Sequence, residues 1–207
     1  MIDNYDVNED GVIFQKKYSK INYDTNYIST RYDTYGITNA FISNLRLGYV
    51  LGSIGYVPES ILDVGYGNGA FLKECTKIIK NCYGFDVTGY PVPKNVEFVK
   101  DWLLHPAEVL TFFDVLEHFD DPYIVKNCTA QYIIISLPWC HYVSDDWFYN
   151  WKHRRPNEHL WFFNEKNIFK FANSIGYDVI NYNNMEDIIR DSTDELPNIL
   201  TVSMKKR

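Results

Sequence analysis

The sequence predicts an α/β fold in which a mostly parallel sheet carries helices on both faces. From Ser60 onward, short apolar runs alternate with segments of helical periodicity, as in proteins built from successive strand–helix units. One run, Tyr132–Ile135, is apolar throughout, which is typical of a strand buried on both sides. A cluster of glycines directly follows the first run, where a strand would turn into a helix.

Seven apolar runs are expected to form the strands. They are Ile61–Val64, Tyr83–Val87, Val96–Val99, Val109–Phe113, Tyr132–Leu137, Tyr177–Tyr182 and Ile199–Met204. Apolar residues three and four positions apart predict an amphipathic helix at Thr38–Ile54, ahead of the sheet. Further helices are expected at Ala70–Lys80, Pro122–Ala130 and Glu165–Ile175, the last closed by Gly176.

The chain length of 207 residues fits a single compact domain. Residues 1–58 begin with a polar, tyrosine-rich stretch and are expected to form an irregular and helical cap on a domain of residues 59–207. The amino terminus has neither a basic start nor an apolar run, so no signal peptide is expected. No apolar stretch approaches the ~20 residues that a membrane-spanning helix needs.

The net charge of −7 gives the whole protein a field that repels phosphate backbones, so a nucleic-acid partner is disfavoured. The four cysteines show no metal-binding spacing. We therefore expect reduced thiols, a cytoplasmic location and no metal site. The sequence leaves the oligomeric state open, and a homodimer is compatible with it.

The most informative segment runs from Ile61 to Leu72 and reads as a strand, the pattern D-x-G-x-G-x-G, and a helix. Gly65, Gly67 and Gly69 allow a sharp turn and let the backbone approach a ligand that a Cβ atom would exclude. The free amides at the start of the helix favour a negative group such as a carboxylate. Because Asp63 adds an acceptor for a cationic group, the turn suits a zwitterionic amino acid.

The same residues also satisfy G-x-G-x-x-A, through Gly65, Gly67 and Ala70, so a nicotinamide dinucleotide is an alternative ligand. Two observations disfavour it. Asp63 would place an anion beside the pyrophosphate, and about 60 residues precede a motif that often begins dinucleotide-binding folds. A glycine-rich turn without any ligand is the remaining interpretation.

Two further acidic residues follow predicted strands. Asp86 lies 21 residues after Gly65, the separation at which a carboxylate accepts the hydroxyls of a ribose in such folds. Asp101 follows the third strand, next to Trp102, and is expected either to accept from an adenine amino group or to be a solvated loop residue.

Four segments in this order resemble the class I S-adenosylmethionine-dependent methyltransferases, in particular the small-molecule branch that includes quinone-biosynthesis enzymes. They are Ile61–Gly69, Gly84–Asp86, Phe112–Pro122 with its D-x-L-E-H pattern, and Glu158–Phe163 followed by a helix and Ser174–Tyr177. The resemblance implies a Rossmann-like, seven-stranded sheet with a reversed last strand. Only residues 88–94 separate the second and third strands, so the helix usual there is expected to be short or missing.

The resemblance also implies S-adenosylmethionine as the cofactor. Asp63 and the glycines would hold its methionine end, Asp86 its ribose, and Asp101 with Trp102 its adenine. The full set of residues expected to bind the cofactor is Asp63, Gly65, Tyr66, Gly67, Asn68, Gly69, Asp86, Val87, Asp101, Trp102, Asp114, Val115 and Leu116. The last three of these would line the cofactor beneath its sulfonium.

Methyl transfer from a sulfonium is an in-line displacement, in which the protein mainly aligns the acceptor with the methyl group. An oxygen or nitrogen acceptor also needs its proton removed, for which a histidine is suited near neutral pH. His118 and His159 are the candidates. Each has a structural alternative, in which the ring only ties its loop together.

Residues 138–163 form a long connection rich in aromatic side chains, which is expected to set specificity for a small acceptor molecule that can be anionic. Arg154 and Arg155 are predicted to pair with a carboxylate or phosphate of the acceptor, and His141 to line the same site. The alternative is a hydrophobic flap with a solvated basic tip. From position alone, Tyr27 or Arg31 would reach the cofactor, as would Tyr18.

Three other functions were weighed against this one. A nicotinamide-dependent oxidoreductase would share the fold, and a protein that binds S-adenosylmethionine without catalysis would share the cofactor site. A methyltransferase acting on RNA or protein is disfavoured by the net charge, and because Asp114–Glu117 stands where a motif of the Asn-Pro-Pro-Tyr type would be expected.

Overall fold

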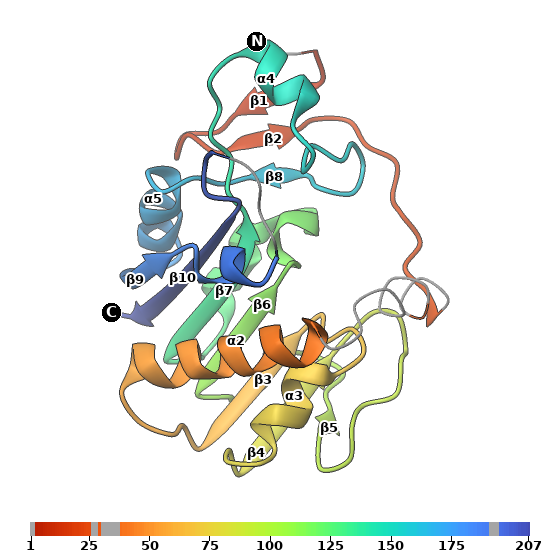
Figure 1. Ribbon diagram of the computed structural model, residues 1–207, viewed down its shortest axis with the longest axis vertical. Helices are drawn as coiled ribbons and strands as arrows, with labels where there is room; N and C mark the ends of the chain where they lie inside the picture. The colour runs from red at the N-terminus through yellow and green to blue at the C-terminus, as the bar shows by residue number, and fades with distance from the viewer. Residues whose placement is uncertain (1–2, 26–28, 30–37, 191–194) are drawn as a thin grey trace.

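The computed structural model describes residues 3–25, 29, 38–190 and 195–207. Its main sheet has seven strands in the order β5-β4-β3-β6-β7-β10-β9 (Figure 1). They are β3 (Ser60–Val64), β4 (Asn81–Phe85), β5 (Glu97–Phe98), β6 (Val109–Phe113), β7 (Tyr132–Pro138), β9 (Tyr177–Asn183) and β10 (Ile199–Lys206). The last strand, β10, runs antiparallel to both of its neighbours, whereas β3 to β7 pair in parallel. The predicted fold class, with its reversed last strand, is confirmed.

Helices cover both faces of this sheet. On one face, α2 (Thr38–Ile54) packs through Leu47 and Val50 in the same apolar cluster as Phe71 of α3 (Ala70–Cys75). The other face is covered by α5 (Asn167–Ser174) and the 3-10 helix η2 (Pro122–Asn127). Burying apolar side chains on both faces is what allows the central strands to be apolar throughout.

Several predicted elements are shorter than expected. Helix α3 ends at Cys75 rather than at Lys80, and the chain continues in turns in which the amides of Ile78 and Ile79 both bond the Cys75 carbonyl. The segment from Pro122 forms a 3-10 helix rather than an α-helix. The connection from β4 to β5 contains no helix, as the sequence predicted, and it includes Pro91 and Pro93.

A second, three-stranded sheet in the order β1-β2-β8 was not predicted. It consists of β1 (Tyr5–Val7), β2 (Ile13–Gln15) and β8 (Trp161–Phe162), all antiparallel. Figure 1 shows it beyond one end of the large sheet, together with α4 (Asp145–Asn150). Because β2 pairs with β8, the amino-terminal segment is held against the long connection that follows β7.

Parallel strands place their carboxyl ends at one edge of a sheet, and in open α/β sheets this edge is where ligands bind. Here the ends of β3, β4 and β6 meet at that edge, beneath the segment that follows β2. Among the described residues, no helix is both long enough and apolar enough to cross a bilayer.

Candidate active site

A cavity of about 1090 Å³ opens at the carboxyl edge of β3, β4 and β6. Small-molecule sites commonly measure about 300–1,000 Å³, so this volume accommodates a nucleoside-sized ligand together with a second small molecule. Of the residues predicted to bind a cofactor, those that line the cavity are Gly65, Gly67, Asp86, Val87, Trp102, Asp114 and Val115.

The glycine turn has a backbone that other residues rarely adopt. Gly65, Gly67 and Gly69 have φ values of +75°, +57° and +75°. A Cβ atom at Gly65 would lie 2.4 Å from a methyl group of Val115, and one at Gly69 would lie 2.4 Å from the Pro93 ring. Glycine at both positions is therefore required by the conformation and by the packing.

Asp86 ties the glycine turn to the end of β4. Its Oδ2 accepts from the amide of Gly67 at 2.9 Å, and its Oδ1 accepts from the amide and the hydroxyl of Thr88 at 2.8 and 2.6 Å. A carboxylate offers about four acceptor positions, and three are used here. In this arrangement Asp86 has room for one hydroxyl of a ribose rather than for both.

Asp63 lies behind the cavity wall instead of in it. The side chain is buried, and its Oδ1 accepts from the Thr111 hydroxyl at 2.6 Å. Burial raises the pKa of Asp63 to about 7, although the Thr111 hydrogen bond and the charge of Arg46 oppose this change. Asp63 thus supports the turn from below.

Tyr66 and Asn68 stabilise the turn and do not line the cavity. The Tyr66 ring is buried, and its hydroxyl donates to the backbone carbonyl of Tyr90. The Asn68 Oδ1 accepts from the amide of Ala70 at 3.1 Å, where α3 begins. Both side chains therefore affect a bound ligand only indirectly, by fixing the backbone of the turn.

On the predicted adenine side, Trp102 lines the cavity but Asp101 does not. The Asp101 side chain is exposed, and its Oδ1 accepts from the amides of Leu103 and Leu104, which closes a turn. Leu116 is buried in the main apolar core. The wall near Trp102 is therefore mainly apolar.

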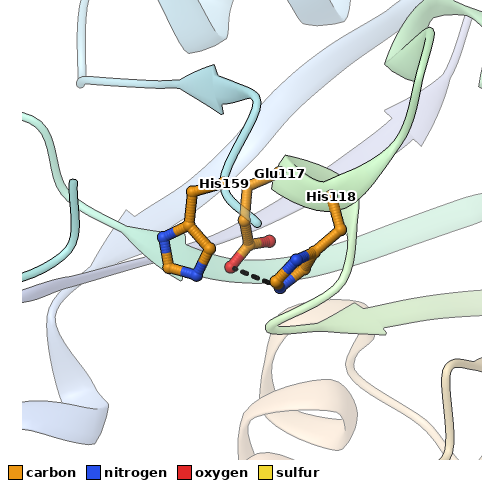
Figure 2. Close-up of side chains that lie close together, drawn as sticks. All are labelled: Glu117, His118 and His159. Carbon is orange, nitrogen blue, oxygen red and sulfur yellow. Dashed lines mark ion pairs between the residues drawn. The ribbon is translucent and has the colours of Figure 1, made fainter. Parts of the chain in front are cut away.

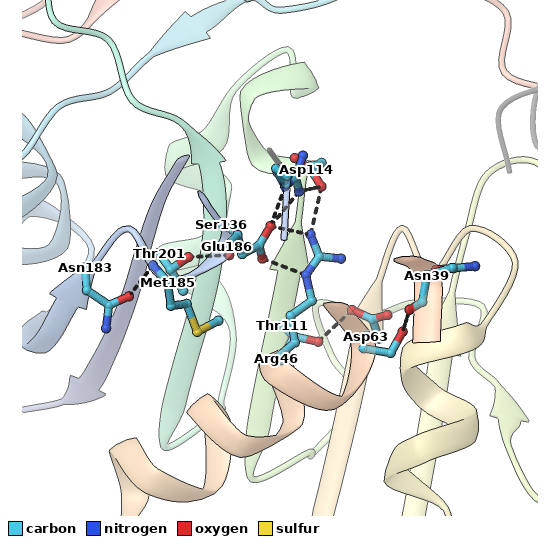
Figure 3. Close-up of polar contacts among 12 residues, drawn as sticks. Asn39, Arg46, Asp63, Thr111, Asp114, Ser136, Asn183, Met185, Glu186 and Thr201 are labelled. Carbon is cyan, nitrogen blue, oxygen red and sulfur yellow. Dashed lines mark hydrogen bonds and ion pairs between the residues drawn. The ribbon is translucent and has the colours of Figure 1, made fainter. Parts of the chain in front are cut away.

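A buried ionic cluster joins three elements beside the cavity (Figure 3). Arg46 of α2 donates to Glu186 at 2.7 Å and to Asp114 at 2.9 Å, and Arg190 donates to the same two residues at 2.8 and 2.5 Å. Glu186 belongs to the 3-10 helix η3 (Met185–Ile188) and is completely buried. Two cations and two anions balance here.

The two arginines of this cluster keep its two carboxyl groups ionised by lowering their pKa values. Burial alone would raise the pKa of Asp114, but Arg190 and Arg46 hold it well below its usual range. The two arginines lower the pKa of Glu186 in the same way, against its burial. The sequence analysis missed Arg46, Glu186 and Arg190, because no local pattern links residues so far apart in the chain.

Glu117, His118 and His159 converge beside the same cavity (Figure 2). His118, at the end of the 3-10 helix η1 (Leu116–His118), lines the cavity, whereas His159 is buried with its ring centroid 4.8 Å from that of His118. The Nε2 of His118 lies 3.9 Å from Oε1 of Glu117. Burial, and then the neighbouring His118, lower the pKa of His159 to about 2, so its ring is neutral near pH 7.

Neither predicted acceptor-binding arginine lines the cavity. The Arg154 guanidinium lies over the rings of Tyr149 and Tyr5, at 4.6 and 5.4 Å from their centroids. Arg155 forms an ion pair with Glu158 at 3.3 Å. Both cations are engaged by residues outside the cavity lining.

The same long connection contributes two other residues to the cavity, Lys152 and His153. The Nε2 of His153 lies 2.7 Å from Oδ1 of Asn198. His141, which was expected to contact the acceptor, bonds the Pro197 carbonyl at 2.8 Å and is not part of the lining.

The amino-terminal segment supplies Lys20 to Tyr23 to the cavity wall. The Tyr18 hydroxyl donates to Asp120 at 2.7 Å, and Asp120 itself lines the cavity. Tyr27 and Arg31, which were expected to reach the cofactor, lie outside the residues that the structure describes.

A sheet of this order, with a glycine turn after β3 and an acidic residue after β4, defines the class I S-adenosylmethionine-dependent methyltransferases. Residues 46–182 match the family model described as a methyltransferase domain, and the chain belongs to that family. The predicted class is confirmed, as is S-adenosylmethionine as methyl donor. The family match also decides for a methyltransferase over an oxidoreductase. The quinone-biosynthesis branch stays a prediction.

Solved structures of known methyltransferases share the fold at low identity. The 1,6-didemethyltoxoflavin-N1-methyltransferase of Burkholderia thailandensis, solved with its acceptor and S-adenosylhomocysteine, is 11% identical, with a TM-score of 0.60 over 98% of this chain and 99% of its own. The magnesium protoporphyrin IX methyltransferase of Synechocystis is 11% identical, with a TM-score of 0.58 over 83% and 84%. An Aquifex aeolicus methyltransferase is 16% identical, with a TM-score of 0.58 over 88% and 98%. No curated protein matches the sequence.

Proposed function

We propose that the protein transfers the methyl group of S-adenosylmethionine to a small molecule bound in the same cavity. The observation that carries this proposal is one cavity lined by two chemically different sets of residues. We assign Gly65, Gly67 and Asp86 to a cofactor end, and His118 and Lys152 to an acceptor end.

The residues at the first end fit the cofactor. Gly65 and Gly67 line the cavity with backbone alone, which permits a close approach of a ligand, and Asp86 keeps an acceptor position for a ribose hydroxyl. Val87 and Trp102 offer apolar surface for the adenine. When bound, S-adenosylmethionine supplies the activated methyl group, and the protein contributes alignment and exclusion of water.

The second end suits a small polar acceptor. Lys152 lines it, as does Lys20 in its ion pair with Asp120 at 2.5 Å, and a cation there favours an acceptor with a negative group. His118 lies in the same lining, where a histidine can handle an acceptor proton. The role of His159 is to support His118, because the His159 ring is buried and outside the lining. That the Burkholderia enzyme holds a small heterocyclic acceptor and S-adenosylhomocysteine on the same fold supports a small-molecule acceptor here.

Calorimetric titration with S-adenosylhomocysteine tests the cofactor end. We expect the Asp86→Ala variant to bind at least about tenfold more weakly than the wild type, since it loses the ribose acceptor and the bond to the glycine turn. The Asp101→Ala variant is the matched control, because this exposed carboxylate only closes its own turn. Equal losses in the two variants, or no binding by the wild type, would contradict the proposal.

A screen of small phenols, carboxylic acids and sugar phosphates as acceptors tests the other end. Transfer of a labelled methyl group from S-adenosylmethionine to one of them, and not to RNA or protein, is the expected result.

A further inference from the structure

Two histidines and one glutamate from distant parts of the chain meet beside the acceptor end of the cavity (Figure 2). One ligand atom of each of Glu117, His118 and His159 lies within 4.8 Å of the others. Around a cation with bonds of about 2.1 Å, ligand atoms are roughly 3–3.5 Å apart, so the widest pair, at up to 4.8 Å, needs to close by roughly 1.3–1.8 Å. Small side-chain rotations supply such a movement.

The hydrogen bonds of the two rings decide which nitrogen keeps its lone pair. Nδ1 of His118 lies 2.8 Å from the carbonyl of Glu158, and Nδ1 of His159 lies 2.7 Å from the carbonyl of His153. A carbonyl oxygen only accepts, so each Nδ1 carries the proton and each Nε2 keeps its lone pair. The Tyr23 hydroxyl, 3.1 Å from Nδ1 of His118, can accept from the same proton.

This pattern is the one that metal-binding histidines usually show, with one ring nitrogen on the metal and the other donating to a backbone carbonyl or carboxylate. The backbone also fixes the two segments relative to each other. The Leu160 amide donates to the Glu117 carbonyl at 2.7 Å, and the Trp161 indole donates to the Phe119 carbonyl at 2.9 Å. The three side chains are therefore brought together by the fold itself.

From this geometry we propose that Glu117, His118 and His159 bind a divalent transition-metal ion at the acceptor end of the cavity. One carboxylate and two neutral imidazoles give the group a single negative charge, which complements a dication. A donor set with two nitrogens favours manganese, iron, cobalt or zinc over magnesium or calcium. Three protein ligands leave coordination positions open, and one of the three, His118, lines the cavity.

This inference rests on the proposed methyltransferase function, and it specifies an oxygen acceptor. A cation at these ligands would lower the pKa of an acceptor hydroxyl. In this arrangement His118 and His159 would hold the ion instead of taking the acceptor proton. The hydroxyl would give its proton to water, and its oxygen would form the new bond to the methyl carbon. The electron pair of the broken C–S bond stays on sulfur, which leaves S-adenosylhomocysteine. Cysteine spacing alone predicted no metal, whereas this group joins the adjacent Glu117 and His118 to His159, which lies 41 residues after His118.

Calorimetric titration of the chelator-treated full-length protein with MnCl₂, ZnCl₂ and MgCl₂ tests the site. We expect one equivalent of Mn²⁺ or Zn²⁺ to bind the wild type and to raise its Tm. Glu117→Gln and His118→Gln should weaken this binding at least about tenfold. The His105→Ala variant should bind like the wild type, because His105 packs on Tyr83 away from the cavity lining.

Each sample is also titrated with S-adenosylhomocysteine, which separates the two proposals. Cofactor binding without Mn²⁺ or Zn²⁺ binding by the wild type would overturn the metal site alone, and so would unchanged metal affinity in Glu117→Gln and His118→Gln. Failure to bind S-adenosylhomocysteine would overturn the proposed function. A variant that does not fold by circular dichroism is replaced by Glu117→Asp, which keeps the charge and should weaken the metal less than Glu117→Gln does.

Discussion

The two ends of the cavity are built in different ways. The cofactor end is formed by Gly65, Gly67 and Asp86, which lie within 22 residues of one another and act largely through backbone geometry. The acceptor end is formed by Lys20, His118 and Lys152, which come from three separate segments. On the proposed function, a local motif would hold the methyl donor, whereas tertiary packing would bring together the residues that face the acceptor.

The ionic cluster of Arg46, Asp114, Glu186 and Arg190 beside the cavity is the place where the largest change is expected. Replacing Glu186 by Gln leaves Arg46 and Arg190 without half of their compensating charge in a buried site. Breaking such a network typically costs about 3–5 kcal/mol. Chemical denaturation should show a loss of this size for Glu186→Gln. The exposed Glu97→Gln should change the free energy of unfolding by less than about 0.5 kcal/mol. Similar values for both variants would contradict the structural role of the cluster.

The burial of Asp63 beneath the cofactor end predicts a pH dependence. Because its pKa is raised from 3.8 to about 7, the folded protein binds this proton more tightly than the unfolded chain does. The contribution of Asp63 to stability is thus fully present below pH 4 and is lost as the pH rises to about 7. Relative to the wild type, Asp63→Asn should gain on the order of 4 kcal/mol in free energy of unfolding between pH 4 and pH 8. A difference that does not vary with pH would show that burial does not control this carboxyl.

Two glycines with similar backbone angles distinguish the effect of backbone strain from the effect of a steric clash at the cofactor end. A Cβ atom added at Gly65 (φ +75°) would lie 2.4 Å from the Val115 side chain. One added at Gly176 (φ +88°) would have no neighbouring atom within 4 Å. We expect Gly65→Ala to weaken S-adenosylhomocysteine binding at least about tenfold in calorimetry. Gly176→Ala should cost only the backbone strain of about 1 kcal/mol and leave this affinity unchanged. Equal affinities of the two variants for S-adenosylhomocysteine would contradict a role of Gly65 in forming the cofactor end.

The smallest effect is expected at the acceptor end. Lys152 lines the cavity, and its replacement by Ala should raise the KM of an anionic acceptor several-fold, which corresponds to about 1 kcal/mol. Arg155→Ala removes only an ion pair with Glu158 outside the lining, so the same KM should stay unchanged. A larger increase in KM for Arg155→Ala would restore the original expectation for that arginine.

The sequence predicted the large sheet well, because its central strands are buried on both faces and their apolar runs are uninterrupted. Strand β6 has the predicted bounds Val109–Phe113, and β7 is only one residue longer than predicted. The strands β1, β2 and β8 have two or three residues each and no repeating pattern. Only their pairing with distant partners makes them strands, so local sequence could not reveal them.

The site shows the same limit. Gly65, Gly67 and Asp86 were found because the conformation of a tight turn restricts which residues can occupy it. Among the four adjacent basic residues 152–155, the sequence favoured the two arginines, but only Lys152 and His153 face the cavity. The Arg154 guanidinium instead lies over the ring of Tyr149. Local sequence does not reveal such a contact, so it could not show which of the four side chains faces the cavity.

The pairing of Phe14 with Trp161 has a consequence for how the enzyme matures during translation. The hairpin of β1 and β2 is separated from its partner strand β8 by 145 residues, so the two can pair only after that whole stretch has been made. Until then, the segment that follows β2 lacks this anchor, although contacts such as that of the Tyr18 hydroxyl with Asp120 involve residues made earlier. The small sheet is therefore completed after strands β3 to β7 of the large sheet have been made.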